Sequence, residues 1–535
     1  MSALELGPVQ SFVDELLRHG VRFVVCPGSR SSPLVQALLA RNAQMFSVVD
    51  ERSAGYQALG MAQALGTPVA VVTTSGTAAA NLLPAMCEAY FARVPVLALT
   101  ADRPAEWIGQ EDNQAIHQRG LFYRHVLAEF ETPVDTSHPD ARWHMERVAR
   151  DALRACERRG PVHVNMPFRE PLYVEERCDL PPVIPVVSTP GVLSPLAFDD
   201  DEGALTRASR PLLLAGQTEL GGIDVLPYAD RLPVTGELLA NLPGSVAPEL
   251  WITDESALPD LVVTTGGAFV SKFVRQAIRR LGAPHWHMGE PRGAEPFQRA
   301  VRRLDPRRLE SVRAVHYRES FAQAVARGGA RRDAWLQDHP DGEIACLRAI
   351  LDATKPGTSV HLGNSLIVRI ACLVGQGKPG VRYHSNRGTS GIDGSLSTAV
   401  GHALACPDRE HLAIVGDLSF FYDRNALWRE TWPSNLRIIV VNNGGGAIFN
   451  ALPGPGKWGE DTKWWTTPHQ LTARATAESH GLAYEEARNA GEITRWLERG
   501  PSASLLEVFT ERERTAAEFR DLLATLAQPH GPSTP

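Results

Sequence analysis

The sequence predicts an α/β protein made of three domains, each with a doubly wound parallel sheet. Short apolar runs rich in valine, isoleucine and leucine alternate with helical patterns along the chain, which is typical of parallel α/β architecture. The chain has 535 residues, too many for a single hydrophobic core. A proline-rich stretch at 179–200 and a polar, arginine-rich stretch at 301–340 interrupt the pattern. We therefore expect domains at 1–180, 181–345 and 346–535.

Composition and charge exclude several classes of function. The formal net charge of -7 gives no support for nucleic-acid binding. No apolar run approaches the ~20 residues that a membrane helix needs, and the first residues carry no signal-peptide pattern. The 7 cysteines are scattered without any Cys-x-x-Cys spacing, which indicates a reducing compartment. We expect a cytoplasmic protein that acts on small molecules and does not insert into a membrane.

In the first domain, polar turns follow the predicted strands. The strands are expected at 22–26, 46–50, 69–73, 94–100 and 161–166, with helices at 52–65 and 77–91. The turns are Gly28-Ser29-Arg30, Glu51-Arg52, Ser75-Gly76-Thr77 and Ala101-Asp102-Arg103. Ligands of open parallel sheets bind beyond the carboxyl ends of the strands, so these turns are candidate binding segments.

The other two domains repeat the pattern. Strands are expected at 211–215 and 261–265, then at 358–362, 381–384, 412–415, 436–441 and 503–509. The stretch at 301–340 is expected to be helical, and 179–200 is interpreted as a linker. The tail after 528 is expected to be disordered.

The strongest motif lies between Gly416 and Gly446. One apolar strand leads into Gly416-Asp417-Leu418-Ser419, and a second leads into Asn442-Asn443-Gly444-Gly445-Gly446. A crossover helix at about 420–430 would place the two strand ends side by side. A carboxylate at Asp417, an amide oxygen at Asn443 and a backbone carbonyl near Gly445 are the hard ligands that Mg²⁺ prefers, and glycines let the backbone approach a diphosphate. Either half alone would suit a helix-capping acid or an ordinary turn; together they favour a metal-diphosphate anchor.

With this anchor, the sequence resembles the thiamine-diphosphate enzymes. Within them it resembles the 2-succinyl-5-enolpyruvyl-6-hydroxy-3-cyclohexene-1-carboxylate synthases of menaquinone biosynthesis, over the whole chain. The segments that carry the resemblance, besides Gly416-Asp417-Leu418-Ser419, are Pro27-Gly28-Ser29-Arg30-Ser31, Asp50-Glu51-Arg52, Thr74-Ser75-Gly76-Thr77-Ala78, Thr100-Ala101-Asp102-Arg103-Pro104, Asn113-Gln114, Gly363-Asn364-Ser365, Ser385-Asn386-Arg387-Gly388 and Gly391-Ile392-Asp393-Gly394.

The resemblance implies a transferase that uses thiamine diphosphate and Mg²⁺, with Mn²⁺ as an alternative metal. The first domain would bind the aminopyrimidine ring, the third would bind the diphosphate, and the middle domain would be a related fold without cofactor. The implied reaction is decarboxylation of 2-oxoglutarate and 1,4-addition of the remaining four-carbon unit to isochorismate. The active site would combine two subunits of a homodimer or of a dimer of dimers.

The resemblance also implies roles for individual residues. Glu51 would be the catalytic carboxylate that hydrogen-bonds the aminopyrimidine, which requires a dry site and a raised pKa. Ile392 would support the bent conformation of the cofactor. The remaining cofactor residues would be Gly416, Asp417, Leu418, Ser419, Asn443, Gly445, Ile448 and Phe449, of which Asp417, Asn443 and Gly445 would also bind the metal.

The cationic residues at strand-end turns suit two dicarboxylate substrates. Guanidinium groups bind carboxylates in a bidentate fork. The candidates are Arg30, Arg103, Lys272, Arg369 and Arg387, with Ser29, Asn113, Gln114 and Ser365 as neutral donors. A single arginine more often forms a solvated ion pair, but five such cations in a net-acidic protein favour substrate binding.

Some positions depart from the family pattern or stay open. Phe273 follows Lys272 where some members have arginine, and glycine stands where some have a third asparagine before Gly445. His117 and His469 are interpreted as ordinary polar histidines. The tryptophans at 458, 464 and 465 fit either a flexible lid or an interface patch.

Two rival functions remain. One is another thiamine-diphosphate decarboxylase or carboligase acting on 2-oxo acids; the arginine set argues against it, because pyruvate has one carboxylate. The other is a non-catalytic binding protein on the same fold, against which Glu51 and the intact anchor both argue.

Overall fold

The computed structural model describes residues 7–173, 180–181, 183, 205, 207–218, 222–289, 295–298, 300–452, 454–500 and 503–528. The predicted linker at 179–200 lies largely outside the described residues, and the tail after 528 lies outside them altogether. The chain forms two compact units. The first contains Met1–Leu193, Asn386–Asp408 and Tyr422–Pro433, and the second contains Ser194–Ser385, Arg409–Phe421 and Ser434–Pro535.

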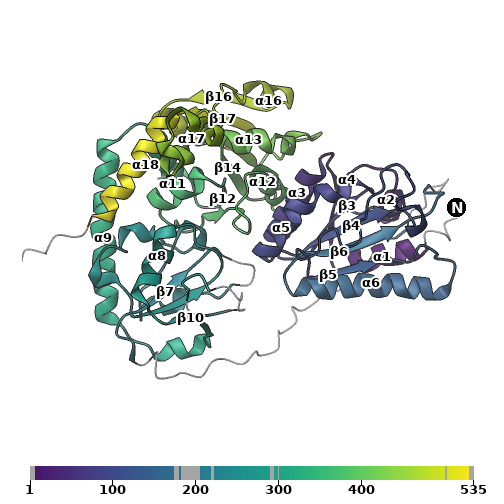
Figure 1. The fold of residues 1–535 in the computed structure, drawn as a ribbon, viewed down its shortest axis with the longest axis horizontal. Coiled ribbons are helices and arrows are strands. Elements are labelled where there is room, and N and C mark those ends of the chain that lie inside the picture. The colour runs from purple at the N-terminus through teal and green to yellow at the C-terminus, as the bar shows by residue number, and fades with distance from the viewer. Residues whose placement is uncertain are drawn as a thin grey trace, which may run out of the picture. The chain divides into compact units, whose positions relative to one another are not determined.

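The first unit is built on a parallel sheet with the strand order β2-β1-β3-β4-β6-β5 (Figure 1). The strands are β1 (Arg22–Val25), β2 (Met45–Ser47), β3 (Val69–Thr73), β4 (Val96–Asp102), β5 (Ala128–Glu131) and β6 (Val162–Pro167). Five of them are the predicted strands. The sixth, β5, was not predicted, because this edge strand has alternating half-buried and exposed residues and two glutamates rather than an apolar run.

Helices cover both faces of this sheet, as a doubly wound fold requires. They are α1 (Gly7–Arg18), α2 (Ser32–Ala40), α3 (Glu51–Leu65), α4 (Thr77–Asn81), α5 (Leu83–Ala92), α6 (Pro139–Glu157) and α12 (Ser395–Ala405), with the short 3₁₀ turns η1 (Ala105–Trp107) and η7 (Arg424–Leu427). Phe23 packs into a core with α1 and α6, and the next residue, Val24, packs into a second core with α3 and α5. Successive side chains of β1 thus point to opposite faces of the sheet and pack into two separate cores.

The helix predicted at 77–91 is in fact two helices. It breaks at Leu82, where α4 ends and α5 begins. Pro84 lies in the first turn of α5, where its missing N–H is tolerated, whereas inside one continuous helix it would clash with the preceding turn. The prediction of a single helix was therefore wrong.

Helix α12 belongs to the first unit although it lies far along the chain. It packs against α3 at two glycines. A Cβ atom on Gly60 would come within 2.1 Å of the Thr398 carbonyl oxygen, and one on Gly401 within 2.1 Å of the Gln57 carbonyl oxygen. Only glycine permits this contact between the two helix backbones.

The second unit contains two further parallel sheets. One has the order β11-β10-β9-β7-β8, and the other has the order β13-β12-β14-β15-β17-β16. Their strands are β7 (Pro211–Ala215), β8 (Val234–Gly236), β9 (Leu261–Thr265), β10 (His285–His287), β11 (Val301–Arg303), β12 (Thr358–Leu362), β13 (Arg382–His384), β14 (Glu410–Gly416), β15 (Leu436–Asn442), β16 (Ala483–Ala487) and β17 (Ser504–Phe509). The seven predicted strands are present, while β8, β10, β11 and β16 are short or polar and were missed.

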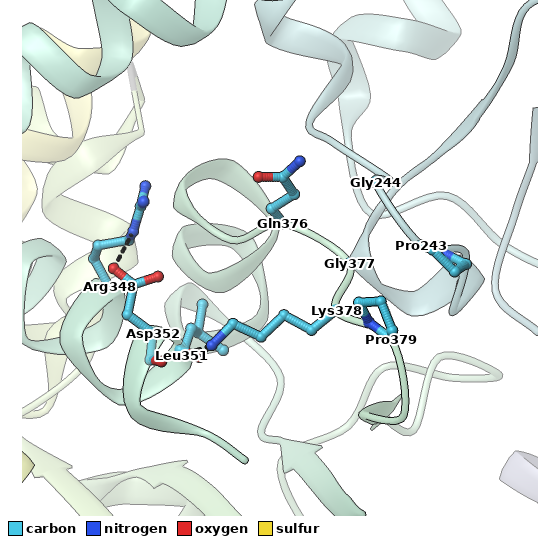
Figure 2. A pocket seen from close by; sticks show the side chains of 9 residues that line it. All are labelled: Pro243, Gly244, Arg348, Leu351, Asp352, Gln376, Gly377, Lys378 and Pro379. Atoms are coloured by element: carbon cyan, nitrogen blue, oxygen red, sulfur yellow. Dashed lines mark hydrogen bonds and ion pairs between the residues drawn. The ribbon is translucent and has the colours of Figure 1, made fainter. Parts of the chain in front are cut away.

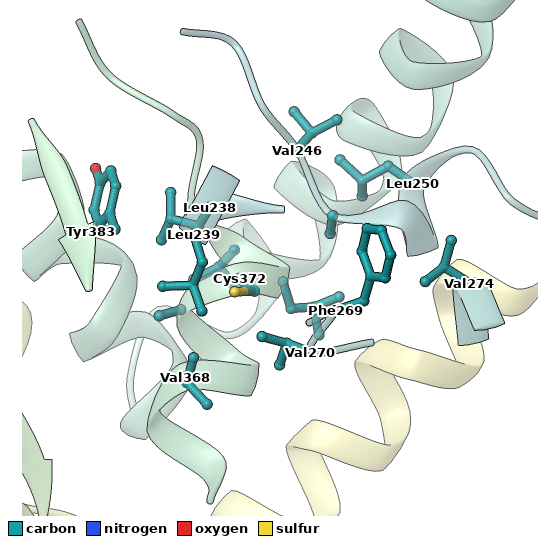
Figure 3. Packing of buried hydrophobic residues seen from close by; sticks show 14 of the residues in the cluster. Leu238, Leu239, Val246, Leu250, Phe269, Val270, Val274, Val368, Cys372 and Tyr383 are labelled. Atoms are coloured by element: carbon teal, nitrogen blue, oxygen red, sulfur yellow. The ribbon is translucent and has the colours of Figure 1, made fainter. Parts of the chain in front are cut away.

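The helices of the second unit are α8 (Lys272–Leu281), α9 (Val315–Asp338), α10 (Glu343–Ala353), α11 (Leu366–Val374), α13 (Asp417–Tyr422), α14 (Ala447–Ala451), α15 (Lys463–Thr466), α16 (Arg474–Ser479), α17 (Ala490–Glu498) and α18 (Arg512–Ala527). The described residues of this unit also form seven 3₁₀ turns: η2 (Leu226–Tyr228), η3 (Leu238–Ala240), η4 (Pro248–Leu250), η5 (Glu255–Ala257), η6 (Pro306–Ser311), η8 (Pro455–Lys457) and η9 (Gly459–Thr462). Buried side chains from both sheets form one core, in which Leu239 and Phe269 of the middle segment lie near Val368 and Cys372 of α11 (Figure 3).

Two helix predictions in this part of the chain were wrong. The stretch 301–340 begins with β11 and η6 and becomes α-helical only at Val315, because Val301 pairs with His285 in the sheet. The crossover predicted at 420–430 is not one helix but α13 followed by η7. The break falls at Asp423, whose carboxylate accepts hydrogen bonds from the backbone N–H and the hydroxyl of Ser397 in α12. In both places tertiary hydrogen bonds override local helix preference.

Among the described helices, none combines the length and the apolar character needed to cross a membrane. None of the six cysteines within the described residues forms a disulfide, and the seventh, Cys178, lies outside those residues.

Three histidines are stacked on neighbouring strands of the third sheet. The ring of His361 lies 5.1 Å from that of His384 and 5.3 Å from that of His411, at 19° and 20° between ring planes. The Nε2 atom of His361 and the Nδ1 atom of His411 are 3.0 Å apart and share a hydrogen bond. Burial, together with His411 and two nearby arginines, lowers the pKa of His384 to about 3.

This lowered pKa predicts a loss of stability in mild acid. The unfolded chain binds a proton at His384 near pH 6.5 and the folded chain only near pH 3, so stability is fully present above pH 6.5 and falls as the pH drops toward 3. From pH 7.5 to 5.5 we expect His384 to cost about 1.4 kcal/mol of unfolding free energy. Urea unfolding of His384→Phe should show a correspondingly smaller pH dependence.

Candidate functional site

The predicted anchor forms where two neighbouring strands end. Strands β14 and β15 are adjacent and parallel, with Gly416 opposite Val441. Asp417 begins α13 at the end of β14, and Asn443 follows the last residue of β15. The structure therefore brings the two halves of the motif together, although they lie 26 positions apart.

The Asp417 carboxylate connects the two strand ends. It is buried and accepts backbone N–H groups from Leu418 at 2.6 Å, from Asn443 at 3.2 Å and from Gly445 at 2.9 Å. Burial raises the pKa of Asp417, and the N–H groups of Gly445 and Leu418 partly oppose that rise. A cation at this carboxylate would favour the charged form further.

The side-chain oxygen of Asn443 has no hydrogen-bond donor among the described residues. Its Nδ2 atom donates to Glu343 Oε2 at 2.9 Å. Its Oδ1 atom is buried and has no hydrogen-bond partner among the described residues. Buried polar atoms are normally paired, so an orphaned oxygen beside a buried carboxylate fits a divalent metal with oxygen ligands.

Gly445 has a backbone conformation that excludes other residues. Its φ is +143°, and a Cβ atom there would lie 2.5 Å from the Thr466 carbonyl oxygen. The Gly445 carbonyl accepts one backbone N–H, from Ala447 at 3.1 Å, which leaves a second lone pair for a ligand. The donor set of Asp417, Asn443 and Gly445 therefore fits Mg²⁺. Within the described residues no cluster of three His, Cys, Asp or Glu side chains suits a metal, so amide and backbone oxygens would have to complete the set.

His469 also lies at the anchor, which its sequence context did not indicate. Its Nε2 atom is 3.5 Å from Asp417 Oδ2. The Leu471 N–H donates to its Nδ1 at 3.1 Å, which places the proton of the neutral ring on Nε2, facing the carboxylate. No motif marks this residue, because it reaches Asp417 only through the fold of 444–469.

The other predicted residues of the second unit are placed as follows. Ser419 is buried, and Gly416, Leu418, Ile448 and Phe449 are half-buried around the anchor segment.

Ser365 precedes α11 with φ +70°, and Arg369 donates to its carbonyl at 2.5 Å. Lys272 is exposed at the first residue of α8, and Phe273 beside it is 42% exposed. Trp458, Trp464 and Trp465 are also exposed, and their role stays a prediction.

In the first unit, Glu51 begins α3 directly after the capping residue Asp50. The Asp50 side chain accepts the Ser53 N–H at 3.1 Å and thereby caps the helix. Burial, and then the charge of Asp50, raises the pKa of Glu51. The charges of Glu51 and Asp50 in turn add to the effect of burial on the pKa of the Cys26 thiol. The structure thus confirms the predicted direction of the Glu51 pKa.

Contacts on both sides of Glu51 hold the start of α3 in place. Asn425 donates to Asp50 at 2.7 Å, and Arg52 donates to the Tyr422 carbonyl at 2.7 Å with its guanidinium 4.6 Å from the Tyr422 ring. Burial raises the pKa of nearby Asp423 to about 7, and Arg52 opposes that rise. No local pattern predicted this network, since its partners lie more than 360 positions apart.

Arg30 and Arg103 form a buried cationic pair in the first unit. Burial, and next the charge of Arg103, lowers the pKa of Arg30. Arg30 donates to the Phe168 carbonyl at 3.0 Å, and its buried Nε has no partner among the described residues. Arg103 donates to Ser75 Oγ at 2.7 Å and pairs with Asp112. Two buried guanidinium groups in the same part of the unit fit an anionic ligand.

The remaining candidates of the first unit differ in their surroundings. Ser29, Asn113, Gln114 and His117 are exposed. Gln118, which sequence reasoning missed, is buried and accepts the Gly76 N–H at 2.9 Å. Arg387 and Ile392 flank a loop that is tied to α5 and α3: Gly388 N–H donates to Glu88 at 2.7 Å, and Tyr56 donates to Asp393 at 2.9 Å.

Two family models match separate parts of the chain. Residues 9–121 match the thiamine pyrophosphate enzyme N-terminal TPP binding domain, and residues 369–508 match the corresponding C-terminal TPP binding domain. Curated proteins named 2-succinyl-5-enolpyruvyl-6-hydroxy-3-cyclohexene-1-carboxylate synthase match almost the whole chain. The protein from Bacteroides fragilis is 34% identical over 95% of this chain and 96% of its own length. The protein from Cytophaga hutchinsonii is 34% identical (96% and 98%), and that from Desulfotalea psychrophila is 35% identical (94% and 98%).

The chain belongs to this synthase family of thiamine pyrophosphate enzymes. The N-terminal match contains Glu51, Arg30 and Arg103, and the C-terminal match contains Asp417 and Asn443. The fold expected for the family, with three parallel α/β sheets, is confirmed.

A pocket of about 340 Å³ in the second unit contains none of the predicted synthase residues. Figure 2 shows Lys378 extending along it toward Leu351, with Arg348 paired to Asp352. The Lys378 ammonium donates to three backbone carbonyls, those of Leu351, Asp352 and Thr354. Because its cations are already engaged, this pocket is not a candidate for the family's cofactor or substrates.

The backbone of Gly445 predicts a sensitive position in the anchor. In Gly445→Ala, the new methyl group would collide with the Thr466 carbonyl, in a strained conformation that costs roughly 1–3 kcal/mol. We expect a lower melting temperature and a loss of at least about tenfold in thiamine diphosphate affinity, measured by fluorescence titration. Gly454→Ala, where the added atom meets open space, should change neither; equal effects of both substitutions would contradict the assignment.

Proposed function

We propose that the protein is a thiamine-diphosphate-dependent 2-succinyl-5-enolpyruvyl-6-hydroxy-3-cyclohexene-1-carboxylate synthase of menaquinone biosynthesis. It would decarboxylate 2-oxoglutarate and add the four-carbon unit to isochorismate in a 1,4 sense. The observation that carries the proposal is the Asp417–Asn443 anchor, in a chain that matches curated synthases over almost its whole length.

In this proposal the anchor holds the diphosphate through Mg²⁺, or Mn²⁺ in its place. Asp417 Oδ, Asn443 Oδ1 and the Gly445 carbonyl supply the protein oxygens. The half-buried side chains of Ile448 and Phe449 would contact the bound cofactor, as would Ile392. When bound, thiamine diphosphate supplies the electron sink for decarboxylation and the nucleophilic carbon for addition.

Glu51 would hold a proton between its carboxylate and a ring nitrogen of the aminopyrimidine. A carboxyl group with a raised pKa shares a proton more readily near neutral pH than an exposed glutamate does. Its position at the start of α3 is held by the contacts of Asp50 and Arg52. The protein thereby fixes the proton site before substrate arrives.

The cationic residues would orient the substrates, each of which carries two carboxylates. Arg30 and Arg103 are the best supported, because both are buried and the charge of Arg103, after burial, lowers the pKa of Arg30. Lys272, Arg369 and Arg387, with the neutral donors Ser29, Asn113, Gln114 and Ser365, would complete the binding set. A substrate with one carboxylate would engage only part of this cationic set.

We further propose a cytoplasmic homodimer, or a dimer of dimers, with domains at 1–180, 181–345 and 346–535. Each active site would combine Glu51 of one subunit with the anchor of its partner. The family membership supports this arrangement, and the following two experiments test the reaction and the assembly.

The substrate assignment is tested by turnover with Mg²⁺ and thiamine diphosphate. We expect CO₂ from 2-oxoglutarate and the carboxylate product once isochorismate is added. Arg103→Met should raise KM for at least one dicarboxylate by roughly 10–100-fold, the value of a charged hydrogen bond, while Arg150→Met on α6 should not. Release of CO₂ from pyruvate but not from 2-oxoglutarate would overturn the synthase assignment in favour of another 2-oxo acid decarboxylase.

The shared active site is tested by mixing two inactive variants. Glu51→Gln should bind thiamine diphosphate but lose decarboxylation, and Asp417→Asn should lose metal-dependent cofactor binding. If each site takes Glu51 and the anchor from different subunits, one of the two sites in a mixed dimer is intact. Random exchange should then restore up to about a quarter of wild-type activity. No recovery, with exchange confirmed by mass, would show that both groups come from one chain.

A further inference from the structure

Two consecutive asparagines at the end of β15 are each held by a different buried glutamate. Asn442 Nδ2 donates to Glu507 at 2.7 Å, and Asn443 Nδ2 donates to Glu343 at 2.9 Å. Glu507 lies on β17 and Glu343 begins α10. Neither glutamate belongs to the motif that marks the anchor.

The two asparagines use their oxygens differently. Asn442 Oδ1 accepts the Gly444 N–H at 3.1 Å, so its hydrogen bonds close the turn after β15. Asn443 Oδ1 is buried and has no donor among the described residues. The first carboxamide therefore builds the backbone of the anchor, whereas the second keeps an acceptor available.

Glu343 is itself held rigidly as an acceptor. It is 1% exposed, and its Oε2 atom accepts Thr510 Oγ1 at 3.2 Å and Thr515 Oγ1 at 3.0 Å in addition to Asn443. Three groups that can donate converge on this one oxygen, which supports its role as acceptor and the assigned orientation of the Asn443 amide.

Because of the geometry of a carboxamide, the hydrogen bond to Glu343 sets the orientation of the Asn443 side chain. Nitrogen and oxygen are bonded to the same carbon on opposite sides, so fixing Nδ2 on Glu343 turns Oδ1 away from Glu343. The backbone N–H of Asn443 meanwhile donates to Asp417 Oδ2 at 3.2 Å, which fixes the residue beside the carboxylate. A ligand held in this way loses little freedom when a metal binds.

We propose that Glu343 is a positioning residue of the anchor: it orients the Asn443 carboxamide so that Oδ1 is presented to the divalent metal. The inference rests on the proposed function of Asp417 and Asn443 as metal ligands. It assigns to Glu343 no contact with the metal, the cofactor or the substrates. Partners that orient a metal ligand typically contribute 10–100-fold to metal affinity.

The test measures Mg²⁺-dependent binding of thiamine diphosphate to the full-length apoprotein, followed by tryptophan fluorescence without turnover. Glu343→Met keeps the side-chain length but removes the acceptor, and should weaken the apparent Mg²⁺ affinity about 10–100-fold. Glu343→Gln keeps an acceptor oxygen for Asn443 and should stay within about threefold of wild type. Glu237→Met, which removes a similarly buried carboxylate that accepts the backbone N–H groups of Val270 and Ser271 in the same unit, should leave the Mg²⁺ affinity unchanged.

A double-substitution cycle separates orientation from general stability. In an Asn443→Ala background the oriented oxygen is gone, so adding Glu343→Met should change the Mg²⁺ affinity by less than about threefold. Equal losses in both backgrounds, or a Glu343→Met protein with wild-type Mg²⁺ affinity, would overturn the proposal. If Glu343→Met does not fold, Thr515→Val, which removes one donor that holds Glu343, should still weaken Mg²⁺ binding measurably; no change would overturn the proposal. Failure of the wild-type protein to bind thiamine diphosphate with Mg²⁺ would instead overturn the proposed function.

Discussion

The rest of the candidate site depends on the hydrogen bonds that the Asp417 carboxylate accepts. It accepts backbone N–H groups from its own helix start and from the turn after the neighbouring strand, at Asn443 and Gly445. A buried carboxylate needs such donors to remain charged. In meeting that need, the protein also fixes the separation of the two strand ends, and with it the place of the oxygen ligands.

The same principle operates around Glu51 in the first unit. A carboxyl group with a raised pKa can share a proton with a ligand only if it stays in place. Contacts at the start of α3 and farther along the helix hold it there. Asp50 and Arg52 bind the segment at 422–425, and farther along the helix Gly60 meets the backbone of α12. The catalytic candidate is therefore positioned by backbone contacts and hydrogen bonds rather than by its own side chain.

Sequence motifs predicted those parts of the protein in which polar residues directly follow a buried strand. The parallel sheets, the strands that flank the anchor, the proximity of Asp417 to Asn443 and the raised pKa of Glu51 were all predictable, because buried apolar strands and polar turns are local patterns. Short or charged strands such as β5 and β16 were not, since their pairing partners rather than their residues make them strands. The roles assigned to the substrate arginines stay predictions.

By itself, the sequence determined the fold class and the cofactor class. Only the tertiary structure decided how the residues of the candidate site are held. Glu343 lies 100 positions from Asn443, and His469 reaches Asp417 through a loop that no motif describes. Hydrogen bonds between such distant residues depend on burial and on the direction of each donor, and neither is encoded in local spacing. The orientation of the Asn443 oxygen is therefore a property of the folded chain.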